Sequence, residues 1–178
     1  MNILLNLNPL ITRAARLAVI VVISGFALSV LPSCKKEDPA VKYARLMETA
    51  RKYIAEDKLE EAKITLYSAV DLRPDQAGTY FELGEVLVRL KQYPKAAESF
   101  LAALNADPNH KEARLHLATL YLLGKEWEQA DSHTRKLLET DPKNTAALIL
   151  KASIARGQGR LDETFSILEN VLKTEPNN

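Results

Sequence analysis

Signatures of catalysis and of disulfide-stabilised folds are scarce in this chain of 178 residues. The single cysteine excludes an internal disulfide, so the fold must be stabilised by packing. The motifs G-x-S-x-G, G-x-x-x-x-G-K-[ST], H-E-x-x-H and C-x-x-C are all absent from the sequence. The three histidines, His110, His116 and His133, are too scattered to converge on a metal. We therefore expect no enzymatic activity, no cofactor and no metal site.

Clustered positive charge is lacking as well. The chain has 24 basic and 23 acidic residues, and two of the basic ones, Arg13 and Arg16, precede Cys34. The remainder is nearly neutral, which argues against a nucleic-acid-binding protein, because such proteins need clustered Lys and Arg to displace counterions. Apolar residues make up 47% and charged residues 26%, close to the average of globular proteins, so the chain as a whole is not expected to be disordered.

Residues 1–33 have the pattern of a targeting segment. Residues 1–16 end in the two arginines and contain no acid, and residues 17–31 are an uncharged, mostly apolar run. This run is shorter than the roughly 20 residues that a membrane-spanning helix needs. The sequence Leu31-Pro32-Ser33-Cys34 follows, and then a charged stretch.

This arrangement resembles a bacterial lipoprotein signal, with Leu31 three residues before the cysteine and Ser33 directly before it. The resemblance implies cleavage after residue 33, acyl chains such as palmitate on Cys34, and a tether over residues 34–42. Pro32 departs from the small residue that is typical before Ser33. The alternative is an uncleaved anchor over residues 3–31. Lys35, where an aspartate would favour the inner membrane, implies an outer-membrane lipoprotein that faces the periplasm.

A repeat runs through the rest of the chain, marked by evenly spaced prolines at Pro74, Pro108, Pro142 and Pro176. Placing each proline at repeat position 32 divides the chain into residues 43–76, 77–110, 111–144 and 145–178. Small residues then recur at position 8 and mostly at position 20, and large apolar residues mostly occupy position 24: Ala50, Gly84, Ala118 and Ala152; Ala62, Ala96, Ala130 and Thr164; Leu66, Phe100, Thr134 and Leu168.

These positions resemble the tetratricopeptide repeat (TPR), most completely in the second copy, with Tyr80, Leu83, Gly84, Leu87, Tyr93, Ala96, Phe100, Ala103 and Pro108. The resemblance implies an all-α, right-handed α-solenoid of four TPR helix pairs. The last helix has too many apolar residues for one inner face: Phe165, Ile167, Leu168, Val171 and Leu172. We therefore expect an apolar end that is covered by a partner, by a second copy, or by further repeats of a longer chain.

In TPR proteins the first helix of each repeat lines a concave groove that binds peptides. The resemblance places these residues in the groove: Arg51, Phe81, Glu82, Glu85, Arg89, Leu115, His116, Thr119, Leu122, Ile149, Ser153 and Arg156. A mixture of apolar and charged groups suits a peptide or an amphipathic helix as the partner. The alternative is that Leu122, Leu123 and Leu150 only pack between adjacent first helices.

Together these features predict a membrane-anchored TPR scaffold or adaptor that binds protein partners in the bacterial cell envelope. Pilotin-like proteins, outer-membrane assembly lipoproteins and the TPR lipoproteins of exopolysaccharide or PEP-CTERM sorting systems have this combination, and residues 50–55 look most like the last group. The alternative is a regulator or docking subunit of an envelope enzyme, or the TPR part of a longer chain with a catalytic domain. Self-association through the fourth repeat is a further expectation.

Overall fold

The computed structural model describes residues 37–174, which form eight α helices and no strand. The all-α prediction is confirmed for these residues, whereas the predicted signal peptide and Cys34 lie outside them. The helices are α2 (Pro39–Ala55), α3 (Leu59–Leu72), α4 (Ala77–Arg89), α5 (Tyr93–Ala106), α6 (Lys111–Leu123), α7 (Trp127–Thr140), α8 (Thr145–Gly157) and α9 (Leu161–Thr174). None of these helices is long and apolar enough to cross a membrane.

The helices follow the period of the sequence. The second helices of the repeats begin at Leu59, Tyr93, Trp127 and Leu161, all at repeat position 17. The first three of them end two residues before Pro74, Pro108 and Pro142, because a proline disfavours helical geometry in the residue that precedes it. Pro94 occupies the first turn of α5, where the missing N–H removes no helical hydrogen bond.

The first helix starts earlier than the sequence indicated. α2 begins at Pro39, inside the predicted tether, and not at residue 43. Asp38 explains the extension, because its Oδ1 accepts a hydrogen bond from the N–H of Ala40 at 2.8 Å and so caps the helix. Pro39 then fits the first helical position.

Each turn within a repeat places its fifteenth residue in the left-handed region: Asp57, Lys91, Lys125 and Gly159, with φ of 58°, 59°, 60° and 78°. The residue after it donates its N–H back into the last turn of the preceding helix, for example from Gln92 to the carbonyl of Leu87 at 2.8 Å. This pattern is a Schellman motif, which normally has glycine at the left-handed position. Only the fourth repeat has that glycine.

Replacing Lys91 or Lys125 by glycine is therefore expected to stabilise the protein by about 0.5–1 kcal/mol each, because glycine adopts positive φ without a Cβ clash. Gly159→Ala should lower the free energy of unfolding by a similar amount. The free energy of unfolding in urea measures all three variants. Equal stabilities for Lys91→Gly and Gly159→Ala would contradict this account of the turn.

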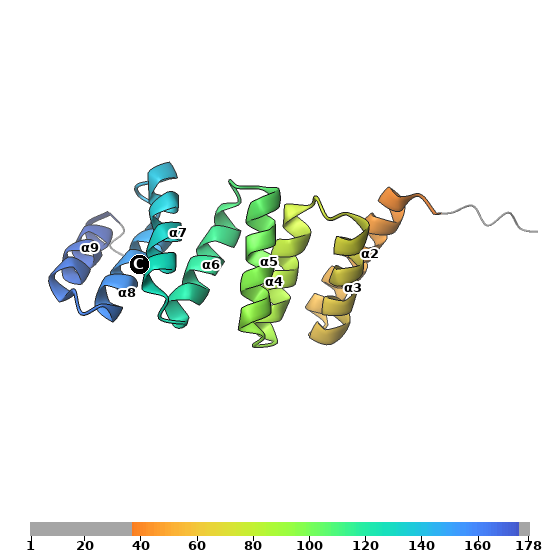
Figure 1. Ribbon diagram of the computed structural model, residues 1–178, viewed down its shortest axis with the longest axis horizontal. Helices are drawn as coiled ribbons and strands as arrows, with labels where there is room; N and C mark the ends of the chain where they lie inside the picture. Colours follow the sequence, from red (N-terminus) through yellow and green to blue (C-terminus); the bar gives the residue numbers. More distant parts are fainter. Residues whose placement is uncertain (1–36, 175–178) are drawn as a thin grey trace, which may run out of the picture. The chain divides into compact units, whose positions relative to one another are not determined.

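The helices pack in chain order, each first helix against its own second helix and against the second helix of the repeat before it. Figure 1 shows this succession from α2 to α9. The small residues at position 8 and the alanines at position 20 are buried, and Phe100 and Leu66 are completely buried at position 24. In the last repeat, Leu168 at the same position is 37% exposed, because no further described helix covers α9.

Candidate peptide-binding face

The first helices α2, α4, α6 and α8 lie next to one another and form one continuous surface, which we call the first-helix face. Tyr43 of α2 shares a hydrogen bond with Thr79 of α4, with 2.6 Å between their oxygens. The ring of Phe81 in α4 meets the ring of His116 in α6 edge-on, with centroids 5.4 Å apart. α6 also contacts α8 directly. Residues from four repeats thus share this surface.

In the first two repeats, both arginines of this face are held in ion pairs. Arg51 forms an ion pair with Glu82, with 2.7 Å between Nη2 and Oε1, and this carboxylate raises the pKa of Arg51 through its hydrogen bond and its charge. Arg89 forms an ion pair with Asp57, which lies in the connection between α2 and α3, with 2.6 Å between Nη2 and Oδ1. These exposed pairs contribute little to stability. They do orient both arginines along the face, so a partner would have to compete for them.

A cluster of aromatic rings and histidines lies between the second and third repeats. The ring of Phe81 contacts both His116 and His110, with 4.9 Å between the centroids of Phe81 and His110. His110 also caps α6, because its Nδ1 accepts a hydrogen bond from the N–H of Ala113 at 3.3 Å. Sequence reasoning placed Phe81 and His116 in the groove, but it did not bring His110 to them. No spacing signal marks His110, because it lies at position 34, in the connection before α6.

The third and fourth repeats supply the apolar part of the face. Leu115 and Leu122 are half-buried and pack against a cluster that contains Leu150 and Ile154. The alternative of packing between first helices therefore holds for Leu122 and for Leu150, which is 6% exposed. It is wrong for Leu123, which is 68% exposed.

Besides Leu123, the accessible groups in this half of the face are Ile149, which is 41% exposed, and the exposed residues Thr119 and Arg156. The hydroxyls of Thr119 and Ser153 donate to backbone carbonyls of their own helices, at 2.8 and 2.9 Å, so they offer no free donor. Glu85, in the second repeat, is also exposed. This half of the face is thus suited to apolar side chains with a few charges beside them.

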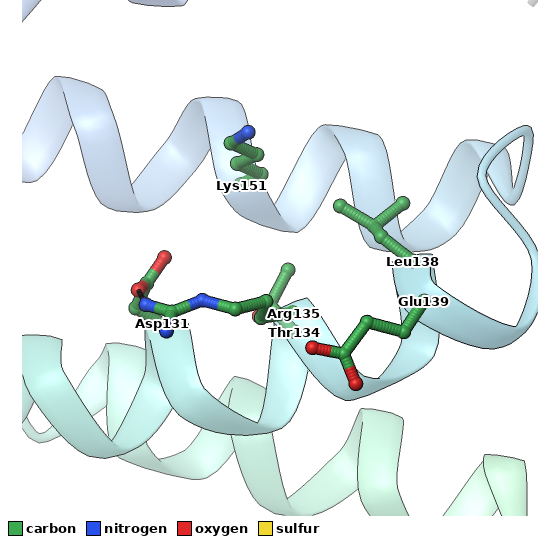
Figure 2. Close-up of a pocket in the computed structure, with 6 residues that line it drawn as sticks. All are labelled: Asp131, Thr134, Arg135, Leu138, Glu139 and Lys151. Atoms are coloured by element: carbon green, nitrogen blue, oxygen red, sulfur yellow. Dashed lines mark hydrogen bonds and ion pairs between the residues drawn. The ribbon is translucent and has the colours of Figure 1, made fainter.

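A separate pocket of about 360 Å³ lies between α7 and α8 and does not include any of the predicted groove residues. Figure 2 shows five lining side chains on α7 and Lys151 on α8. Its walls are mostly charged, and Asp131 pairs with Arg135 at 2.5 Å. Thr134 lines the pocket at the repeat position that Leu66 and Phe100 fill in the preceding repeats. Within residues 37–174, no group of three or more His, Cys, Asp or Glu residues could hold a metal.

His133 lies half-buried on α7, against Tyr121 of α6. Its ring stacks on Tyr121 with centroids 5.6 Å apart, and its Nδ1 is buried without a hydrogen-bond partner among the described residues. Burial lowers the pKa of His133 below its ordinary value of 6.5, and the positive charges of Arg114 and Lys136 lower it further. The neutral form is therefore favoured in the folded protein.

This shift predicts a loss of stability on acidification. Between the lowered folded pKa of His133 and the unfolded value near 6.5, the unfolded chain binds more protons, so the free energy of unfolding falls as pH decreases through this window. His133→Gln should remove this part of the pH dependence. Urea unfolding of both proteins between pH 5 and 8 tests the prediction, and parallel stability curves would contradict it.

The stacked helix pairs, the left-handed turn in every repeat and the shared first-helix face define a TPR-type α-solenoid. The family described as "Cytochrome c-type biogenesis protein H TPR domain" matches residues 35–178, and the chain belongs to this family.

Several known proteins are similar to this chain in sequence or in structure. The human protein O-mannosyl-transferase TMTC3 is 32% identical over 107 residues, which cover 60% of this chain and 12% of that protein. A TPR protein from Parabacteroides merdae superposes with a TM-score of 0.75 at 22% identity, covering 86% of this chain and 58% of the other. YrrB, described as a TPR protein with an unusual peptide-binding site, gives a TM-score of 0.70 at 18% identity, with coverages of 96% and 84%. The solved structures show the fold alone.

Proposed function

We propose that this protein is a non-catalytic scaffold that binds a peptide or helix of a protein partner on its first-helix face, chiefly in the third and fourth repeats. The observation that carries the proposal is the contrast within the face. Arg51 and Arg89 in the first two repeats are held in ion pairs, while Ile149 stays exposed beside the half-buried Leu115 and Leu122. Apolar side chains that are exposed on a rigid helical array are the usual anchors for a bound helix.

Three substitutions test this proposal. Ile149→Glu places a charge on the apolar part of the face and should weaken partner binding at least tenfold. Leu101→Glu is the matched control, because Leu101 lies on the second helix α5 and is 37% exposed, compared with 41% for Ile149. Thr119→Glu should act like Ile149→Glu. The measurement is the dissociation constant for the partner that copurifies with the wild-type chain, and equal effects of Ile149→Glu and Leu101→Glu would refute the groove.

We further propose that the chain is a lipoprotein, anchored through Cys34 to the outer membrane and facing the periplasm. The charge and hydropathy pattern of residues 1–35 supports this placement. Two or more acyl chains give stable anchoring, since each buried methylene contributes about 0.8 kcal/mol. Because α2 begins at Pro39, only the five residue-to-residue steps from Cys34 to Pro39 separate it from the anchor, and they reach at most about 18 Å, which would hold the array close to the bilayer.

The anchor is tested by Cys34→Ser. The substitution should release the protein from the membrane fraction while its binding to the partner in solution stays unchanged. Metabolic labelling with palmitate should mark the wild-type chain and not the variant. A variant that stays in the membrane fraction would favour the uncleaved anchor of residues 3–31.

The family description favours a particular setting, the assembly of c-type cytochromes, and this is our second candidate. In that case the chain would act as the docking subunit of an envelope enzyme system, which is the alternative that the sequence left open. Deletion of the gene should then lower the haem-stained c-type cytochromes of the host. Normal cytochromes together with a defect in polysaccharide export or protein sorting would instead favour a scaffold in one of those envelope systems.

A further inference from the structure

The second helix of the fourth repeat has a stripe of exposed apolar side chains, which we call the α9 face: Leu161, Phe165, Leu168 and Leu172, with exposed fractions of 54%, 68%, 37% and 53%. Their intervals of four, three and four residues keep them on one side of the helix, in the pattern of a helix-packing seam. Val171, on another side of α9, is buried at 4% exposure. The stripe is therefore not the side by which α9 packs into its own repeat.

The preceding repeats show which kind of element covers this stripe. Its members occupy repeat positions 17, 21, 24 and 28. In the second repeat, positions 17 and 21 (Tyr93 and Ala97) share a pocket wall with Leu120 of α6. In the third repeat, positions 21, 24 and 28 (Asp131, Thr134 and Leu138) face Lys151 of α8. These positions thus receive the first helix of the next repeat.

The α9 face differs from its covered counterparts chiefly at position 21. Position 21 is Lys63, Ala97 and Asp131 in the first three repeats, but it is Phe165 in the fourth. Phe165 is the largest side chain of the stripe and also the most exposed. A contiguous apolar stripe of this kind is typical of an interaction surface.

The first helix of a second copy fits the α9 face poorly. At the third and tenth positions of its repeat, α2 has the exposed residues Arg45 and Lys52, where α8 has the buried residues Ala147 and Ile154. Docking α2 of another copy would bury two charges against leucine and phenylalanine, which is electrostatically unfavourable.

A membrane surface fits poorly for a similar reason. α9 carries three acidic residues, of which Glu163 pairs with Arg160 and Glu169 pairs with Lys173. Helices that lie in a membrane interface are rich in Lys and Arg on their polar side. Asp162, beside the stripe, has no ion pair among the described residues, so it favours an occupant with a basic residue at this flank.

We propose that the α9 face is a docking surface for an amphipathic helix of a partner protein, which lies on α9 as the first helix of a repeat lies on the second helix before it. The partner helix is apolar on one side and has Lys or Arg at its flanks. This surface is distinct from the first-helix face, so the chain can hold two partners, or two segments of one partner, at the same time.

The test uses the purified full chain and a fluorescein-labelled peptide with the sequence of residues 111–124, which contain the first helix α6 and its basic residues Lys111 and Arg114. Fluorescence anisotropy should rise saturably with the wild-type chain. Phe165→Glu should weaken binding at least tenfold, whereas Ser166→Glu, at an exposed neighbouring position, should leave it unchanged. Ile149→Glu should also have no effect, which separates this proposal from the first-helix face. Absence of saturable binding, or equal binding to Phe165→Glu, would overturn the proposal.

A second measurement identifies other occupants. Phe165→Cys in a Cys34→Ser background should react with a maleimide as fast as Ser166→Cys at every protein concentration. Slow labelling only at high concentration would assign the face to a second copy, and slow labelling at all concentrations to another segment of the same chain. Protection by phospholipid vesicles without protection by the peptide would assign it to a membrane. Each of these three results would overturn the proposal.

Discussion

Phe100→Ala should lower the free energy of unfolding by about 3–5 kcal/mol, the largest effect of any single substitution considered for this chain. The side chain is completely buried. Its ring lies 5.8 Å from that of Phe81 and 5.3 Å from that of His116, so it joins the second repeat to the third. Since each repeat is stable only against its neighbours, the cavity should loosen this junction and with it the array. Urea unfolding followed by circular dichroism measures the loss.

Phe165→Ala is the matched control for this prediction. The same side chain is removed, but from a position that is 68% exposed in the described fold. The expected change is within about 0.5 kcal/mol, as for other surface substitutions. If the two variants lost the same stability, the assignment of Phe100 to the core of the array would be wrong.

Gly84→Ala is expected to destabilise the protein by about 1–3 kcal/mol, although alanine is the better helix former. A Cβ on this residue would lie 2.4 Å from Cε1 and 2.7 Å from Cδ1 of Phe100, so the buried ring would have to move. The glycine at position 8 of the second repeat thus leaves the space that the phenylalanine at position 24 fills. The free energy of unfolding in urea again measures the effect.

Two further variants separate this clash from the general effect of glycine substitution. Gly78→Ala lies in the same helix with nothing within 4 Å of its Cβ, and it should be neutral or stabilise by about 0.5 kcal/mol. Combining Gly84→Ala with Phe100→Leu should give a smaller loss than the sum of the two single effects, because the smaller side chain relieves the clash. Additive losses would show that the ring and the glycine are not coupled.

The positions of the helices were predictable because the 34-residue period is visible in the sequence. Evenly spaced prolines mark where helices end, and the small residues Gly84 and Ala96 mark where the two helices of a pair approach each other. The start of α2 was missed, because the cap formed by Asp38 is a local hydrogen bond outside the period. The left-handed turns could not be predicted at Lys91 and Lys125, since lysine gives no composition signal for positive φ.

The binding face was predictable as a set of positions and not as a set of interactions. A helical repeat dictates that Arg51 and Glu82 lie on the same face, but whether they pair depends on the rotamers of two long side chains. The contact of His110 with Phe81 was missed for another reason, because His110 lies in the connection between repeats, where the helical spacing gives no orientation. An apolar surface on α9 was anticipated from composition, but Val171 of the predicted set is buried and Leu161, which belongs to the exposed stripe, was not predicted. The comparison with covered junctions indicates the kind of helix that would cover the stripe.

The most direct test of the central claim, that a protein partner binds the first-helix face, is site-specific photocrosslinking in the native host. A photoreactive amino acid replaces Ile149 on this face in one strain and Leu101 on α5 in another, two positions of nearly equal exposure. The account predicts one discrete protein adduct from position 149 and none from position 101. Adducts of equal yield from both positions, or an adduct from position 101 alone, would contradict it.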